Sequence, residues 1–119
     1  MQQGLVIKGL GNGRSRAYPT INLDPQILGN SLPSGVYAAF VYIDGKKYKG
    51  ALFFGPRKIL QEENDVLEIH ILDFDGQIYA KQVTFSVEAF IRDVRDFTSF
   101  ADLKKQIALD IKQVLLLLA

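Results

Sequence analysis

The chain has 119 residues, no cysteine and a formal net charge of +1, from 14 lysines and arginines against 13 aspartates and glutamates. A charge so close to zero argues against broad attraction to nucleic acid or to an anionic membrane. The lack of cysteine excludes disulfides, thiolate catalysis and cysteine zinc sites, and the single histidine, His70, excludes a multi-histidine metal site. With 48% hydrophobic residues, we expect one soluble domain over residues 1–119, in keeping with a cytoplasmic protein.

The N-terminal sequence shows no targeting or membrane signal. MQQGLVIKGL lacks the basic start and the long apolar run of a signal peptide. No run approaches the roughly 18 apolar residues of a membrane span. The closing VLLLLA therefore predicts the last turns of a packed helix.

The first prominent feature is the segment Gly9–Leu23, GLGNGRSRAYPTINL, which follows a short β-rich run at Leu5–Lys8. Its glycines permit close approach of the backbone to a ligand, and the guanidinium of Arg14 offers a planar set of donors to phosphate. The segment lacks the Walker A pattern, and no convincing helix follows it as a dinucleotide fingerprint would require. Two interpretations stay open, a phosphate-handling loop and a wide turn.

A short strand is predicted directly after Pro19. Proline pushes the preceding residue towards an extended conformation, so we expect Thr20, Ile21 and Asn22 to run as a strand. Because side chains alternate along a strand, Thr20 and Asn22 share one face and Ile21 lies on the other. Two oxygen-bearing side chains would then point at one ligand.

The next part of the chain predicts a loop followed by a β-hairpin. Asp24–Gly35 is dense in Pro, Gly, Asn and Ser, the composition of a loop. Val36–Ile43 is continuous aromatic and β-branched sequence, typical of a buried strand. Asp44-Gly45 is a two-residue hairpin signal, so the chain is expected to return as a strand at Lys46–Phe54.

A second polar face is predicted on the strand Val66–Leu72. We expect Gly55–Pro56 to end the preceding strand and Gln61–Asp65 to form a solvated loop. Alternation along VLEIHIL then places Glu68 and His70 together on the face opposite to the apolar side chains. Glu68 could be a general base for an attacking alcohol or a solvent-facing charge. His70 could line the same groove or be structural.

Further turns and one more strand precede the C-terminal section. Asp73–Gly76 predicts a hairpin turn, in which the aspartates serve the turn itself. Gln77–Ile91 predicts a long strand that is bent or interrupted near Ser86–Glu88. The polar segment Arg92–Asp96 is either a plain connection or the rim of a ligand pocket.

The C-terminal section predicts one helix. Ser99 followed by Asp102 resembles a capping box. Apolar residues recur at spacings of three and four: Phe100, Leu103, Ile107, Ile111, Val114 and Leu118. Together with about six strands joined by short hairpins, this helix favours a small, mainly β antiparallel barrel with the helix packed against the sheet.

Several motifs in one order resemble the riboflavin kinase (flavokinase) family. They are V-x-K-G, G-x-G-R, P-T-x-N, G-V-Y at Gly35–Tyr37, E-x-H-I-L-D-F-D-G-x-x-Y at Glu68–Tyr79, I-R-D at Ile91–Asp93 and F-x-S-x-x-x-L-K-x-Q-I at Phe97–Ile107. The resemblance implies a six-stranded antiparallel Greek-key barrel with a C-terminal α-helix. It also implies transfer of the γ-phosphoryl group of ATP to the 5′-hydroxyl of riboflavin, which gives FMN.

The resemblance also implies the roles of individual residues. Glu68 would be the catalytic base, and Thr20 and Asn22 would bind Mg²⁺ and nucleotide phosphates. The nucleotide-binding set would comprise Lys8, Gly9, Gly11, Gly13, Arg14, Thr20, Asn22 and Tyr79. The flavin-binding set would comprise Arg92, Asp93, Val94, Phe97 and Leu103.

Two alternatives accompany the kinase hypothesis. Asn12, Arg16 and Ala17 stand where family members commonly have other residues, which motivates a flavin- or nucleotide-binding module of the same fold with weakened catalysis. A small barrel that binds single-stranded nucleic acid through Arg14, Arg16 and aromatic side chains is a third hypothesis, against which the near-zero net charge argues.

The expected partners are the small molecules riboflavin and ATP, with no nucleic acid and no membrane. In bacterial bifunctional members of the family this module follows an adenylyltransferase domain, which would be missing from this chain. The sequence has no HxGH-type motif, so we expect that the chain does not make FAD.

Overall fold

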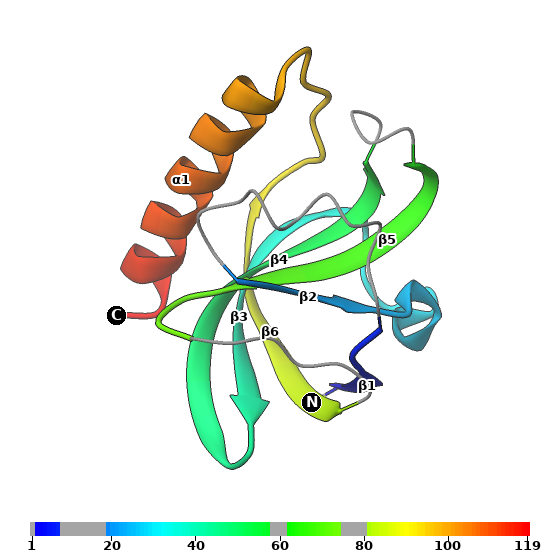
Figure 1. The fold of residues 1–119 in the computed structure, drawn as a ribbon, viewed down its shortest axis with the longest axis vertical. Helices are drawn as coiled ribbons and strands as arrows, with labels where there is room; N and C mark the ends of the chain where they lie inside the picture. Colours follow the sequence, from blue (N-terminus) through cyan, green and yellow to red (C-terminus); the bar gives the residue numbers. More distant parts are fainter. Residues whose placement is uncertain (1, 8–18, 58–61, 75–80) are drawn as a thin grey trace.

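The computed structural model describes residues 2–7, 19–57, 62–74 and 81–119. In these residues six strands form one curled antiparallel sheet, and a single long helix packs outside it (Figure 1). The strands are β1 (Gln2–Leu5), β2 (Thr20–Leu23), β3 (Gly35–Ile43), β4 (Lys46–Arg57), β5 (Glu62–Ile71) and β6 (Gln82–Arg92). The helices are the 3-10 helix η2 (Pro25–Leu28) and α1 (Phe100–Leu117).

The strand order of the sheet is β1-β6-β3-β4-β5-β2. Strands β3, β4 and β5 follow one another as neighbours, and β6 returns to pair with β3, which is the Greek-key arrangement. Ile7, just after β1, forms a bridge with Asn22 of β2, although these segments belong to opposite ends of the strand order. The sheet therefore curls into a half-barrel. The predicted six-stranded antiparallel Greek-key architecture with a C-terminal helix is confirmed.

The hairpin between β3 and β4 has the geometry that its turn residues predict. Asp44 and Gly45 both have positive φ values, 52° and 79°. Such values at both central positions are those of the two-residue turns that match the twist of a hairpin. The nine registered pairs of β3 and β4 follow from this turn without a shift.

Two predicted boundaries are wrong. Strand β4 continues through Gly55 and Pro56 to Arg57, and β5 begins at Glu62, inside the segment predicted as a solvated loop. Gly55, with φ of +146°, pairs with Val66, and the register shifts only after Pro56. A proline is tolerated at such an irregularity because the ladder hydrogen bond that it cannot donate is already disrupted there.

Smaller differences concern the N-terminal region and β6. Strand β1 covers Gln2–Leu5 rather than the predicted Leu5–Lys8. The predicted loop after β2 contains η2, where the Asp24 carboxylate accepts a hydrogen bond from the backbone N–H of Gln26 at 2.9 Å. Near Ser86–Glu88, where a bend or an interruption is predicted, β6 is not broken, but its register to β3 shifts, since Ala38 pairs with Ala89 and Ala39 with Val87.

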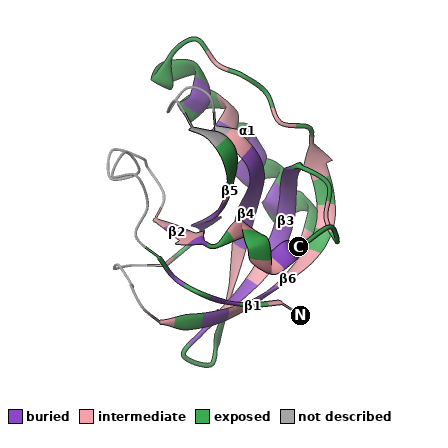
Figure 2. Ribbon diagram, turned by 90° about the vertical axis from the view of Figure 1, so that its right-hand side faces the viewer, coloured by how far each residue is buried: buried purple, intermediate pink, exposed green. Residues whose placement is uncertain are grey.

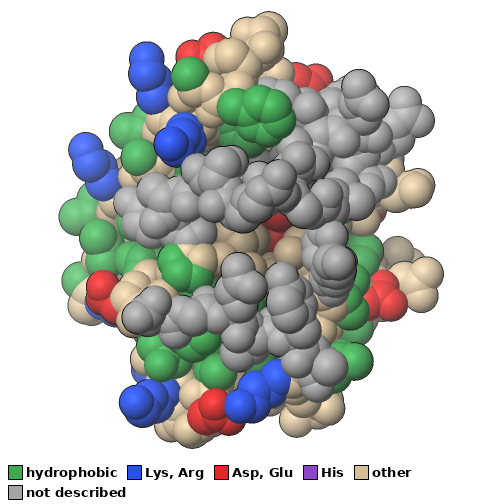
Figure 3. All heavy atoms as spheres, in the orientation of Figure 1, with side chains coloured by type: hydrophobic (Ala, Val, Ile, Leu, Met, Phe, Trp, Pro, Cys, Tyr) green, Lys and Arg blue, Asp and Glu red, His purple; other side chains and the backbone are tan. Residues whose placement is uncertain are grey.

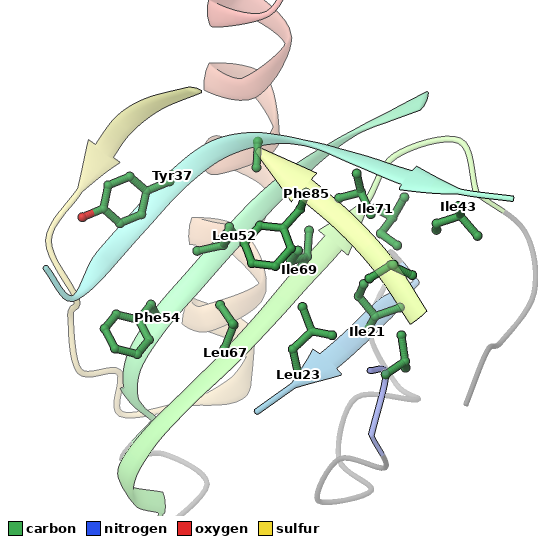
Figure 4. Close-up of a cluster of buried hydrophobic side chains, with 14 of the residues drawn as sticks. Ile21, Leu23, Tyr37, Ile43, Leu52, Phe54, Leu67, Ile69, Ile71 and Phe85 are labelled. Carbon is green, nitrogen blue, oxygen red and sulfur yellow. The ribbon is translucent and has the colours of Figure 1, made fainter. Parts of the chain in front are cut away.

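Two apolar clusters hold the fold together. The first fills the curled sheet, and Figure 4 shows its side chains converging from all the larger strands. Its largest fully buried members include Leu23, Leu52, Leu67, Ile69, Ile71 and Phe85. Each such side chain contributes roughly 1.5–3 kcal/mol relative to exposure.

The second cluster lies between α1 and the outer face of β3 and β4. Ala38 and Ala51 present small side chains there, and α1 packs against them. The buried residues of α1 in this cluster are Leu103, Ile107, Ile111 and Val114, as the apolar spacing predicts. Figure 2 shows that α1 has both buried and exposed residues along its length. Phe100 departs from the prediction, because 53% of its surface is exposed at the start of α1. No helix in the described part of the chain combines the length and the apolar character that a membrane crossing requires.

Candidate active site

The pairing of β2 with β5 brings four polar residues together. Thr20 lies opposite His70, and Asn22 lies opposite Glu68. The intervening residues Ile21 and Ile69 point into the barrel core, so the polar four occupy the other face of the strand pair. Side chains directly opposite each other in an antiparallel pair have Cβ atoms about 4.5–5.5 Å apart. We call this group, Thr20, Asn22, Glu68 and His70, the strand-pair cluster.

The imidazole of His70 lies between Thr20 and Glu68. Its Nδ1 is 2.9 Å from Thr20 Oγ1, a hydrogen bond, and its Nε2 is 3.8 Å from Glu68 Oε1. Glu68 is only 5% exposed and His70 only 3% exposed. The interpretation of Glu68 as a solvent-facing charge is therefore wrong, and the shared polar face predicted for Glu68 and His70 is confirmed.

Apolar residues of β4 border the strand-pair cluster on its other side. Phe53 pairs with Glu68, and Ala51 pairs with His70. Both β4 residues are buried, so the carboxylate of Glu68 lies in a place with little access to water. Electrostatic interactions and hydrogen bonds are stronger in such surroundings than in bulk water. A carboxylate placed here can act on a bound hydroxyl group without competition from many solvent molecules.

A second buried carboxylate holds α1 to the end of β6. Arg92 donates from Nε to Asp110 Oδ1 and from Nη2 to Asp110 Oδ2, both at 2.8 Å. Gln106 Nε2 donates to Asp110 Oδ1 at 3.0 Å, and its Oε1 accepts from Arg95 Nη1 at 3.0 Å. We call these residues, Arg92, Arg95, Gln106 and Asp110, the helix-side cluster. Sequence reasoning found Arg92 but missed Asp110.

One residue predicted to bind flavin, Arg92, belongs to the helix-side cluster, and the others lie near it. Val94 packs closely against Gly55 of β4, since a Cβ at Gly55 would lie 2.8 Å from Val94 Cγ2. Phe97 packs on the apolar cluster under α1, where Leu103 is only 2% exposed. The flavin-binding role of Arg92, Asp93, Val94, Phe97 and Leu103 stays a prediction, but three of the five lie in the segment between β6 and α1, and Arg92 is the last residue of β6.

Tyr37 marks the border between this segment and the barrel. Its hydroxyl donates to the backbone carbonyl of Pro33 at 2.7 Å, and its ring packs edge-on against Phe90. Burial raises the pKa of the Tyr37 hydroxyl above its ordinary value, and the negative charge of Asp93 raises this pKa further. The segment after β6 is thereby electrostatically coupled to β3.

Part of the predicted nucleotide-binding set lies outside the described residues: Lys8, Gly9, Gly11, Gly13, Arg14 and Tyr79. Among the described residues, charged side chains of both signs are scattered over the face drawn in Figure 3, in keeping with the net charge of +1. The described members of the set are Thr20 and Asn22, whose predicted common face is confirmed.

The donor set of the strand-pair cluster fits Mg²⁺. Thr20 and Asn22 supply neutral oxygens from one face of β2, next to the carboxylate of Glu68. Mg²⁺ prefers oxygen ligands and usually takes only one or two from protein, the remainder coming from water and substrate phosphates. If the Thr20 hydroxyl donates the hydrogen bond to His70, both of its lone pairs stay available to a cation. If it accepts that hydrogen bond, one lone pair stays available.

Comparisons with known proteins agree with this architecture. The family model described as riboflavin kinase (Flavokinase) matches residues 1–118. The trifunctional protein RibF/MnmA of Mycoplasmoides gallisepticum is 37% identical over 95% of this chain and 17% of its own length. The RNA-binding riboflavin kinase RibR of Bacillus subtilis is 34% identical over 93% of this chain and 48% of its own length.

A bifunctional and a structural relative extend the comparison. The bifunctional riboflavin kinase/FMN adenylyltransferase of Mycoplasma pneumoniae is 32% identical over 94% of this chain and 40% of its own length. This chain thus spans less than half the length of these three curated relatives. The crystal structure of riboflavin kinase from Trypanosoma brucei, at 22% identity, superposes with a TM-score of 0.63 over 95% of this chain and 75% of that one, which supports the fold. The chain belongs to the riboflavin kinase family.

Proposed function

We propose that this chain transfers the γ-phosphoryl group of MgATP to the 5′-hydroxyl of riboflavin, which yields FMN and ADP. The observation that carries the proposal is the strand-pair cluster, in which a buried carboxylate shares one face with two side chains that carry neutral oxygens. Membership of the riboflavin kinase family supports the same reaction.

Glu68 is the general base in this proposal. The riboflavin 5′-oxygen forms a bond to the γ-phosphorus, the bond from that phosphorus to the β,γ-bridging oxygen breaks, and the hydroxyl proton passes to the Glu68 carboxylate. A positioned base of this kind contributes typically about 10²–10⁴ in rate. The remaining catalysis of phosphoryl transfer is mostly positioning and neutralisation of charge.

Thr20 and Asn22 would hold Mg²⁺ on the face of β2 that they share with Glu68. When bound, the cation neutralises charge on the phosphate oxygens of the nucleotide. His70 keeps the Thr20 hydroxyl in place through the 2.9 Å hydrogen bond. The glycines of the loop, with Lys8, Arg14 and Tyr79, complete the proposed nucleotide site, and Arg92, Asp93, Val94, Phe97 and Leu103 form the proposed flavin side.

The experiment is direct. The purified chain is incubated with riboflavin, ATP and MgCl₂, and the products are separated by chromatography with flavin fluorescence detection. We expect FMN, and none when MgCl₂ is replaced by EDTA. Tight binding of riboflavin without FMN formation would replace the kinase by the alternative, a flavin-binding module of the same fold.

The same chromatogram tests whether the chain makes FAD. We propose that it does not, because the sequence has no HxGH-type motif. An FAD peak in the reaction with riboflavin and MgATP would overturn this part of the proposal.

Nucleic acid is not among the proposed partners, although one relative is named an RNA-binding riboflavin kinase. The net charge of +1 supports this view, because non-specific nucleic-acid binding depends on positive charge. Titration of labelled single-stranded RNA with the chain at low salt should show no binding. Saturable, salt-sensitive binding would add RNA to the partners.

A further inference from the structure

A charged residue interrupts the apolar stripe of α1. Asp110 lies three residues after Ile107 and is only 4% exposed, between residues that pack on the sheet. An isolated carboxylate is expensive to bury, and the cost is offset only by close pairing with good hydrogen-bond geometry. Asp110 meets that condition, because its two oxygens accept three N–H donors at 2.8–3.0 Å.

These donors connect Asp110 to the segment between β6 and α1. The guanidinium of Arg92 holds Asp110 with two N–H groups and donates a third, from Nη1, to the backbone carbonyl of Asp93 at 3.0 Å. Gln106 links the same carboxylate to Arg95, whose guanidinium lies 5.7 Å from the centre of the Phe97 ring. One buried carboxylate therefore fixes the segment at two points.

Under the proposed function, the contacts of Asp110 hold a segment that binds riboflavin. Residues 93–97, here called the flavin-side segment, contain three of the residues proposed to bind riboflavin. A binding segment that is already held in its bound conformation loses less entropy when the ligand arrives, so fixing it increases affinity. The contact of Val94 with Gly55 holds the segment from the β4 side, and the helix-side cluster holds it from α1.

We propose that Asp110 is a positioning residue for riboflavin binding. It contacts no substrate, but it orients Arg92 directly and Arg95 through Gln106, and thereby presets the flavin-side segment. The inference rests on the proposed function, because the affinity that Asp110 is proposed to control is that of the proposed site for riboflavin.

The test is Asp110→Asn, which keeps the volume of the side chain and removes the charge that holds the Arg92 fork. Riboflavin affinity is measured by quenching of riboflavin fluorescence in the presence of MgADP. We expect the Kd and the KM for riboflavin to rise by about threefold to thirtyfold. The KM for MgATP and the kcat at saturating riboflavin should stay within about twofold of the wild-type values.

A matched control separates positioning from stability. Val114→Ala removes methyl groups from a fully buried residue on the same helix, outside the helix-side cluster. We expect Val114→Ala to lower the unfolding temperature while leaving the riboflavin Kd unchanged. An equal rise of the Kd in Val114→Ala and Asp110→Asn would overturn the proposal, as would an unchanged Kd in Asp110→Asn.

A second variant decides the matter if Asp110→Asn does not fold. Gln106→Leu replaces a half-buried side chain and cuts the link from Asp110 to Arg95. The riboflavin Kd should rise by about twofold to threefold, the low end of such couplings. A folded Gln106→Leu protein with wild-type riboflavin affinity would then contradict the proposal.

The two proposals fail in different ways. If the wild-type chain binds riboflavin but makes no FMN, the kinase fails, and the effect of Asp110→Asn on riboflavin Kd still decides the inference. If the wild-type chain makes FMN and Asp110→Asn binds riboflavin normally, only the inference fails. A wild-type chain that neither binds riboflavin nor makes FMN would overturn both.

Discussion

Glu68 and Asp110 are the two buried carboxylates of the described chain, and their surroundings differ in kind. Asp110 accepts three N–H donors, two of them from one guanidinium, and so connects α1 with the end of β6. Glu68 shares a face with a hydroxyl, an amide and an imidazole, which are groups suited to a cation or a phosphorylated substrate. The two carboxylates are equally buried, so it is their neighbours that separate the proposed base, Glu68, from the ion-paired Asp110.

The largest expected effect is on turnover at Glu68. Glu68→Gln keeps the shape of the side chain and removes the base, so kcat for FMN formation should fall by about 10²–10⁴. Binding of MgADP, measured by calorimetry, should be nearly unchanged. Glu88→Gln is the matched control, because Glu88 is an exposed carboxylate hydrogen-bonded to Ser86 on β6. An unchanged kcat in Glu68→Gln would remove Glu68 from the role of base.

The next effect is on stability at Asp110. Asp110→Leu leaves Arg92 without its carboxylate, which should lower the free energy of unfolding by about 3–5 kcal/mol in a urea titration. The double variant Arg92→Leu/Asp110→Leu should recover most of this loss, because apolar residues of similar volume can replace a buried ion pair. If the losses of unfolding free energy in Arg92→Leu and Asp110→Leu simply add in the double variant, Arg92 and Asp110 do not stabilise the fold as a coupled pair.

A smaller effect is expected at Asn22. A hydrogen bond or ligand contact to a charged group contributes about 1.5–3 kcal/mol, so Asn22→Ala should weaken MgADP binding by about tenfold to a hundredfold. The loss should largely disappear when EDTA removes the cation. Asn64→Ala, an exposed amide on β5, is the control and should bind MgADP normally. Equal MgADP affinity in Asn22→Ala and the wild type would count against the metal-side assignment.

The smallest effect concerns pH. The pKa of Tyr37 is raised in the folded protein by burial, and further by Asp93, so its stabilising contribution is complete below the unfolded pKa of about 10. As the pH rises above that value the folded state holds the proton more tightly than the unfolded state, so stability falls. Tyr37→Phe should therefore flatten the decline of unfolding temperature above about pH 10. An equally steep decline in Tyr37→Phe would contradict the shift.

Local sequence patterns predicted those features of the two carboxylate sites that depend only on residues close together in the sequence. Alternation placed Thr20 with Asn22 and Glu68 with His70, and apolar spacing predicted the buried face of α1. The pairing of β2 with β5 joins residues about fifty positions apart, and neither strand specifies its partner or its register. The motif resemblance, not the local pattern, suggested that the two polar faces belong together.

Two errors have physical reasons. Gly55 and Pro56 are strong local signals for a break, but pairing with β5 overrides them and carries β4 on to Arg57. Asp110 was missed because apolar periodicity counts only apolar residues. The available signal was Asp110 itself, an acidic residue within the apolar stripe of α1, together with Arg92 at the end of the preceding strand.

The most direct test of this division of labour is the rate of the chemical step itself. Single-turnover formation of FMN is measured by rapid quench at saturating riboflavin and MgATP for the wild type, Glu68→Gln and Asp110→Asn. We expect Glu68→Gln to slow the step by about 10²–10⁴ and Asp110→Asn to leave it within about twofold. Comparable losses in the two variants, or a wild-type rate in Glu68→Gln, would contradict the assignment of chemistry to one carboxylate and positioning to the other.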